Sequence, residues 1–142
     1  MKKRIILLSV FTLFALPIFA QNIFTAVQSN DINGIRFLLA NGVNVNAKNA
    51  DGETPLIMAV KNGQLRVAKF LLELDANIDM KDKAGNTALI SAVSENNLEM
   101  VNFLINRGAN VNVTDKKHLK AFDYAKQLDN ADMLKLLNTT NS

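Results

Sequence analysis

Few residues of this sequence could carry out chemistry. His118 is the single histidine and cysteine is absent, so a zinc site or a Ser-His-Asp triad would depend on one imidazole, and thiol nucleophiles and disulfides are excluded. Gly52 and Gly85 belong to no glycine-rich phosphate-binding motif. We expect His118 to be a solvated loop residue.

Two pairs of carboxylates are close in sequence, Asp51 with Glu53 and Asp79 with Asp82. Paired carboxylates can serve as general acid and base or bind calcium, but neither pair is part of a calcium-loop pattern. We expect these side chains to be hydrated turn residues. The sequence therefore predicts no catalytic site, no metal and no cofactor, and we expect that the protein is not an enzyme.

The net charge of +3 is concentrated at the start of the sequence. Lys2, Lys3 and Arg4 are three of the sixteen basic residues, and the other thirteen are balanced by thirteen acidic ones. Elsewhere lysines alternate with aspartates, and the loops hold almost no aromatic side chain on which bases could stack. We therefore expect no nucleic-acid partner.

Residues 1–20 have the three parts of a secretory signal. A basic cluster precedes an apolar run, residues 5–16, and Pro17 and Ala20 then provide a helix break and a small residue for cleavage. We expect cleavage near Ala20 and a bacterial product in the periplasm or outside the cell, with no membrane association afterwards. An uncleaved membrane anchor is the alternative, but the uncharged run is shorter than the ~20 residues that a spanning helix needs.

The rest of the sequence repeats with a period of 33 residues. Several residue types recur at this spacing in one register: Ala26, Ala59, Ala92 and Ala125; Leu38, Leu71, Leu104 and Leu137; Phe37, Phe70 and Phe103; and Asn44, Asn77 and Asn110. Such periods are typical of solenoids, whose units bury too little apolar surface alone and stack to form one core.

Two segments, residues 49–59 and 82–92, carry the fullest copies of the repeat: Asn-Ala-Asp-Gly-Glu-Thr-Pro-Leu-Ile-Met-Ala and Asp-Lys-Ala-Gly-Asn-Thr-Ala-Leu-Ile-Ser-Ala. With these motifs the sequence resembles the ankyrin repeat family. The resemblance implies an all-α solenoid of about four helix-turn-helix repeats joined by β-turn loops.

Local residue types support the same fold. Thr54 can cap the first helix of its repeat, and Pro55 suits the first helical position because it lacks an N–H. The helices should end at residues that tolerate positive φ, and the sequence has such residues at the expected places: Asn30, Gly63, Asn96 and Asp129 after first helices, and Gly42, Asp75 and Gly108 after second helices.

We divide the chain into a signal peptide (residues 1–20), a repeat domain (21–138) and a polar tail (139–142). The predicted repeats are 21–48, 49–81, 82–114 and 115–138. The first repeat would begin at Gln21 with its first helix and no preceding loop.

Two features depart from the family pattern. Ile57 and Ile90 replace the signature histidine, so the hydrogen bonds that this histidine makes between loops in the family are absent, and we expect the isoleucines to pack instead. In the last repeat His118 replaces the loop glycine, and residues 120–122 replace Thr-Pro-Leu, as expected for a terminal unit with one side in water.

Ankyrin repeats bind other proteins through their loop tips and the inner face of their first helices, so the resemblance implies a protein partner. The matching positions are Ala50, Asp51, Glu53, Lys61, Asn62, Lys83, Ala84, Asn86, Ser94, Glu95, Lys116, Lys117, Leu119, Tyr124 and Gln127. We expect these side chains not to be used by the stack. Their mixed charge predicts a protein surface of matching polarity, and we expect the chain to be a monomer.

The leading functional prediction is an exported module that binds and regulates or protects a protein in the periplasm. Two alternatives are an inhibitor or immunity protein that neutralises a toxin or hydrolase, and a secreted effector directed at a host. These alternatives stay open at the level of the sequence.

Overall fold

The computed structural model describes residues 22–139, which form eight helices and no strand. The helices are α2 (Ile23–Gln28), α3 (Ile32–Ala40), α4 (Pro55–Lys61), α5 (Leu65–Glu73), α6 (Ala88–Ser94), α7 (Leu98–Asn106), α8 (Ala121–Gln127) and α9 (Ala131–Thr139). None of these helices is long and apolar enough to cross a membrane. The predicted all-α class is confirmed, whereas the predicted signal peptide lies outside the described residues.

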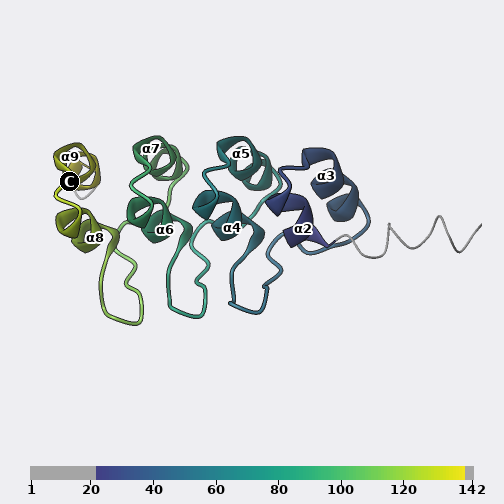
Figure 1. Cartoon of the computed structure of the whole chain (residues 1–142), viewed down its shortest axis with the longest axis horizontal. Helices are drawn as coiled ribbons and strands as arrows, with labels where there is room; N and C mark the ends of the chain where they lie inside the picture. Colours follow the sequence, from purple (N-terminus) through teal and green to yellow (C-terminus); the bar gives the residue numbers. More distant parts are fainter. Residues whose placement is uncertain (1–21, 140–142) are drawn as a thin grey trace, which may run out of the picture.

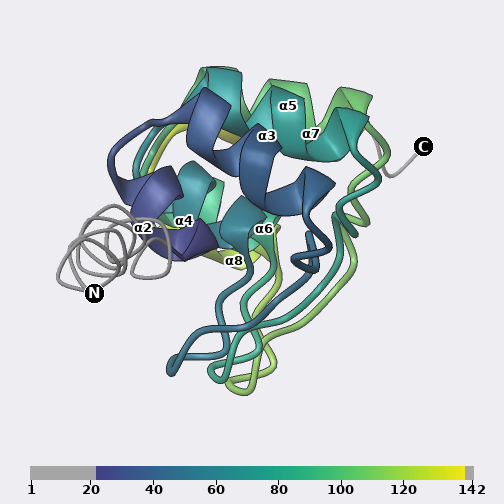
Figure 2. The same ribbon diagram turned by 90° about the vertical axis from the view of Figure 1, so that its right-hand side faces the viewer.

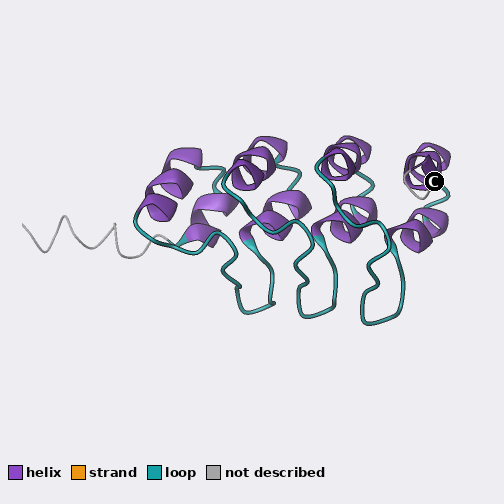
Figure 3. Ribbon diagram, turned by 180° about the vertical axis from the view of Figure 1, so that it is seen from behind, coloured by secondary structure: helices purple, strands orange, loops and turns teal. Residues whose placement is uncertain are grey.

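Consecutive helices form four hairpins that lie side by side in one row (Figure 1). The first helices of the hairpins (α2, α4, α6 and α8) form an inner layer, and the second helices (α3, α5, α7 and α9) form an outer layer. Three long loops, which precede α4, α6 and α8, project from the inner layer in the same direction (Figure 2). This arrangement is the predicted repeat solenoid. In Figure 3 the segments that join the helices are coloured as loops, and residues 22–139 form no strand.

The inner helices α2, α4 and α6 each begin after a residue whose side chain accepts a backbone hydrogen bond. Thr54 caps α4 by accepting the Ile57 N–H at 3.2 Å, and Pro55 is the first helical residue, as predicted. The cap of α2 is Asn22, which accepts the Thr25 N–H at 2.9 Å. The first helix therefore begins one residue later than the 33-residue period places it.

The turns that end the helices have the predicted backbone conformation. All seven positions expected to tolerate positive φ have φ between +50° and +90°. Asp75, the least favourable residue type among the three positions after second helices, has φ +61°. The chain reverses at the predicted positions because these residues allow it.

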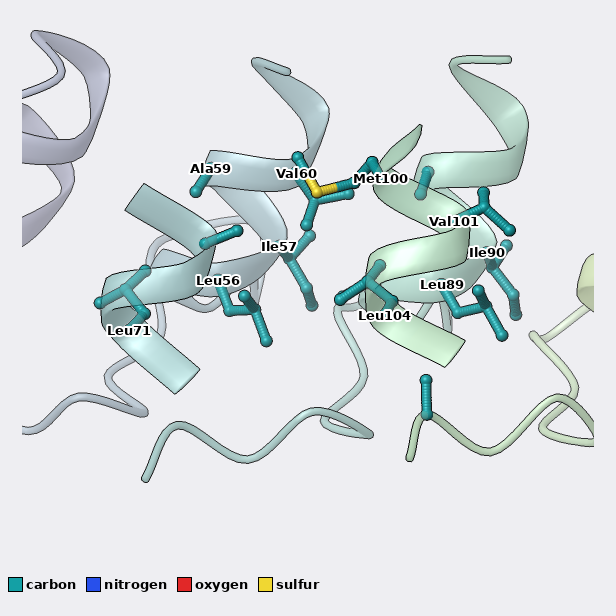
Figure 4. Close-up of a cluster of buried hydrophobic side chains, with 14 of the residues drawn as sticks. Leu56, Ile57, Ala59, Val60, Leu71, Leu89, Ile90, Met100, Val101 and Leu104 are labelled. Carbon is teal, nitrogen blue, oxygen red and sulfur yellow. The ribbon is translucent and has the colours of Figure 1, made fainter. Parts of the chain in front are cut away.

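The core runs through the whole row of hairpins. Alanines at the shared inner-helix position are fully buried, so that two helices approach closely, and leucines from both layers fill the seams between hairpins (Figure 4). Ile57 and Ile90 are each 1% exposed. The prediction that they pack in place of the family's histidine is confirmed.

The last described hairpin carries charged side chains at two positions that are buried in the preceding repeat. Asp123 and Lys126 stand where the preceding repeat has the buried residues Ile90 and Val93. The Asp123 carboxylate accepts the Lys120 N–H at 2.9 Å and so caps α8 without a threonine. These substitutions suit a surface that no further described repeat covers.

Candidate functional site

Each long loop is built around one side-chain oxygen. Asn49, Asp82 and Asp115 each use Oδ1 to accept the N–H groups two and four residues ahead, at distances between 2.8 and 3.0 Å. The three residues are 33 apart, so the period contained this signal. Sequence reasoning missed it and interpreted Asp82 as a hydrated turn residue, whereas its carboxylate organises the loop.

Neighbouring loops are joined by their backbones. The Lys83 N–H donates to the Asp51 carbonyl, and the Lys116 N–H donates to the Ala84 carbonyl, both at 3.0 Å. The approach is so close that a Cβ added at Gly85, where φ is +84°, would lie 2.8 Å from the Lys116 nitrogen. The loops therefore form one connected surface.

Lysines add a second set of bonds between repeats. Lys48 Nζ donates to the Lys81 carbonyl, and Lys81 Nζ donates to the Thr114 carbonyl, each at 2.7 Å. These bonds repeat with the sequence period, because Lys48, Lys81 and Thr114 are 33 residues apart. The loops are thus tied together although the family's histidine is absent.

Glu53 contradicts the expectation that the candidate side chains are not used by the stack. It is 8% exposed, its Oε1 lies 2.5 Å from Lys61 Nζ, and its Oε2 accepts a hydrogen bond from Asn49 Nδ2 at 2.9 Å. It was also predicted to be a hydrated turn residue, which is wrong. The side chain instead joins the loop to the end of α4.

The electrostatics of this pair favour both charged forms. Burial alone would raise the pKa of Glu53, but the hydrogen bonds from Lys61 and Asn49 outweigh burial and hold the pKa below its ordinary value. The hydrogen bond to Glu53 raises the pKa of Lys61, against an opposing effect of burial, and the charges of Asp82 and Glu95 raise it further. Lys61 therefore stays cationic at neutral pH, and the charges of three carboxylates favour this form.

A small hollow of about 160 Å³ lies beside this pair. It is lined by Gln28, Glu53, Met58, Lys61 and Asn62, from α2 and from α4 and its flanks. Gln28 and Met58 were not among the predicted site residues. The 33-residue spacing of Gln28 and Lys61 is the signal that could have included Gln28.

The third loop contains a second buried carboxylate, that of Asp115, which is 6% exposed. Burial would raise the pKa of Asp115, but the Tyr124 hydroxyl and the Leu119 and Lys117 N–H groups donate to the carboxylate and lower it. The hydrogen bond to Asp115 and burial together raise the pKa of Tyr124 to about 12. The Tyr124 hydroxyl thus fastens α8 to its loop.

The predicted site residues differ in how accessible they are. Exposed side chains are those of Ala50, Asp51, Lys61, Asn62, Lys83, Ala84, Ser94, Glu95, Lys116, Lys117 and Gln127, and we call this set the loop face. Asn86, Leu119 and Tyr124 are half-buried, and Glu53 is buried. The structure therefore brings eleven of the fifteen residues to the surface of the loops and inner helices.

Charge varies along the loop face. The first loop presents Asp51, whereas the second presents Lys83 and the third presents Lys116 and Lys117. Within residues 22–139 no three side chains of the metal-ligating types come together. The arrangement offers directional polar contacts on a connected surface, which suits recognition of another macromolecule.

A family model described as ankyrin repeats (three copies) matches residues 23–115 and 81–140. No curated protein matches the chain.

Proposed function

The chain belongs to the ankyrin repeat family, and from that premise we propose that it binds one protein partner outside the cytoplasm, through the loop face, and regulates or protects that partner. Ankyrin repeats indicate a protein–protein interaction module, and proteins of this family are generally binding modules without catalytic activity.

The observation that carries the proposal is that hydrogen bonds join neighbouring loops. Backbone bonds such as Lys83 N–H to the Asp51 carbonyl hold neighbouring loops in register, while the side chains at the loop tips stay exposed. A surface that is ordered before binding loses less conformational entropy when a partner docks. The loop face therefore suits a specific partner.

The change of charge along the face suggests the partner's surface. Asp51 lies at one end of the row of loops, and Lys116 and Lys117 lie at the other. A partner with basic groups opposite the first loop and acidic groups opposite the third would be oriented and accelerated in its approach.

Export is supported by the composition of residues 1–20, where a basic cluster precedes an uncharged apolar run that ends at Ala20. Cell fractionation with intact-mass analysis tests this part. We expect the mature protein in the periplasm or medium, with a mass that begins at Gln21. A mature protein that retains Met1 would overturn export by cleavage.

Binding is tested with variants on two faces. A partner captured from the periplasmic fraction is purified, and its Kd is measured by calorimetry for the wild type, Lys83→Ala, Lys116→Ala and Arg66→Ala. Arg66 is an exposed cation on the outer helix α5 and serves as the matched control. We expect at least one loop variant to raise the Kd about tenfold, or ~1.4 kcal/mol, and the control to leave it unchanged. Equal effects at both faces, or no effect at the loops, would refute the assignment of the loop face.

A further inference from the structure

The outer helices carry a cation–aromatic pattern that crosses from each repeat to the next. The Arg36 guanidinium lies 4.9 Å from the ring centre of Phe70, and Lys69 Nζ lies 5.8 Å from that of Phe103. The two cations are 33 residues apart, and so are the two rings. The first two repeats therefore each supply a cation that lies over the phenylalanine of the next repeat. Arg107, in the same repeat as Phe103, lies 5.3 Å from that ring centre as well.

This pattern is incomplete at both ends of the row. Phe37, the first phenylalanine of the series, is 55% exposed, and no cation among residues 22–139 lies over its ring. Lys135 occupies the position of Arg36 and Lys69 in the last repeat, and no further described repeat follows it. One end presents an uncovered ring, and the other presents a cation in the register that covers such rings.

The cation–aromatic contact is also absent between the last two outer helices, α7 and α9. Between α7 and α9 the cation position is Asn102, and the phenylalanine position is Leu136. An open groove of about 710 Å³ lies at this seam. The groove is lined by Leu98, Glu99, Asn102, Asp132, Lys135, Leu136 and Thr139.

We propose that the groove between α7 and α9 binds α3 of a second copy of this chain, with Phe37 entering the groove. The ring would contact Leu98 and Leu136, and Lys135 would lie near its face, as Lys69 lies near Phe103. Arg36, beside Phe37, would meet the acidic residues of the groove.

Charge complementarity supports a second copy as the occupant. The groove carries two carboxylates, Glu99 and Asp132, against one cation, Lys135. The docking helix offers the exposed ring of Phe37 next to Arg36, which stays exposed although its guanidinium also lies over Phe70 of the same chain. Apolar and charged groups therefore match in both members of the contact.

The geometry makes this association head-to-tail. Helix α3 lies at one end of the row, and α7 and α9 lie toward the other (Figure 1), so a chain cannot fill its own groove. Each added copy leaves one ring and one groove open, and assemblies grow with concentration. A contact centred on one ring is smaller than a standard interface, so the association is weak, and it departs from the monomer expected from the sequence.

Complementary variants test this proposal, each purified in the form in which the cells that produce it accumulate the protein. Phe37→Glu removes the ring and keeps the groove, whereas Leu98→Lys, at a residue 38% exposed, blocks the groove and keeps the ring. Leu128→Glu removes an equally exposed leucine, 42% exposed, outside the groove and is the control. Circular dichroism establishes that each variant is folded, and analytical ultracentrifugation over a range of concentrations gives the mean mass.

We expect the mean mass of the wild type and of Leu128→Glu to rise with concentration, and each of the other two variants to stay at the mass of one chain. An equimolar mixture of Phe37→Glu and Leu98→Lys should reach the mass of two chains and no more, because one intact ring then meets one intact groove. The proposal is overturned by a wild-type mass that does not change with concentration. Self-association of Phe37→Glu alone, or a mixture that stays at one chain, overturns it equally.

Discussion

Replacement of Leu71 by alanine tests whether the repeats stabilise one another through their seams. Leu71 is fully buried on α5, a helix of the second hairpin, which has a described hairpin on either side. Leu38 has the same register one repeat earlier but is only half-buried, since no described hairpin precedes α3. The two leucines therefore form a matched pair, and they differ in how many described hairpins flank their own hairpin.

The expected magnitudes follow from burial. A buried leucine replaced by alanine costs the transfer of the lost methyl groups plus the cavity left behind, about 3 kcal/mol at Leu71. The half-buried Leu38 loses less transfer energy and leaves a gap open to water, which gives about 1 kcal/mol. For a domain of this size the Leu71 change lowers Tm by ~12 °C.

The free energies of unfolding are measured by urea titration with far-UV circular dichroism, and Tm is measured by calorimetry. The slope m should stay unchanged in both variants, since neither alters the surface exposed on unfolding. Equal losses at Leu38 and Leu71 would refute the idea that stacking on both sides buries the central leucine. A loss below ~1 kcal/mol at Leu71 would refute the seam itself.

Three further outcomes are expected. Gly85→Ala should cost at least ~1 kcal/mol, because alanine at positive φ would also press on the next loop; His118→Ala, at the same position of the last described loop, should change the unfolding free energy by less than ~0.5 kcal/mol. The pKa of Glu53 is lowered in the folded state, so the carboxylate stabilises the fold at pH values above its ordinary pKa of 4.5. This contribution disappears as the pH falls through the pKa of the folded state. Glu53→Gln should therefore be less stable than wild type at neutral pH and equally stable in acid, as measured by urea titration at each pH. Tyr124 is the single tyrosine, so near-UV absorbance should show its titration near pH 12. Asp115→Asn should return the pKa of Tyr124 toward 10. Because this pKa is raised in the folded state, the hydrogen bond between Tyr124 and Asp115 stabilises the fold fully below pH 10, and this stabilisation is lost between pH 10 and 12.

Most of the fold could be predicted because it depends on local and periodic properties. The capping role of Thr54 and the positive φ of Asp75 follow from residue type and position within one turn of chain. The burial of Leu71 follows from a period that repeats through the whole domain. Such features need no knowledge of how distant side chains meet.

The accessibility of the candidate site could be predicted only in part, since it depends on such meetings. Glu53 is buried because Lys61, eight residues away, turns back from the end of α4 to meet it. Tyr124 is half-buried because its hydroxyl reaches Asp115, nine residues earlier. The place of both residues within the repeat put their side chains on the predicted binding surface. That place does not show which other residues of the chain a side chain contacts.

These internal partners decide which residues can determine specificity. Replacing a side chain that stabilises its own loop changes stability together with affinity, so neither Glu53 nor Tyr124 can vary freely to suit a partner. The loops obtain their shape from the oxygens of Asn49, Asp82 and Asp115 and from backbone bonds between loops, none of which requires a particular side chain at the tips. Affinity can therefore change at the tips without loss of the fold. The exposed residues of the loop face other than Lys61, which is paired with Glu53, are where the choice of partner should be encoded.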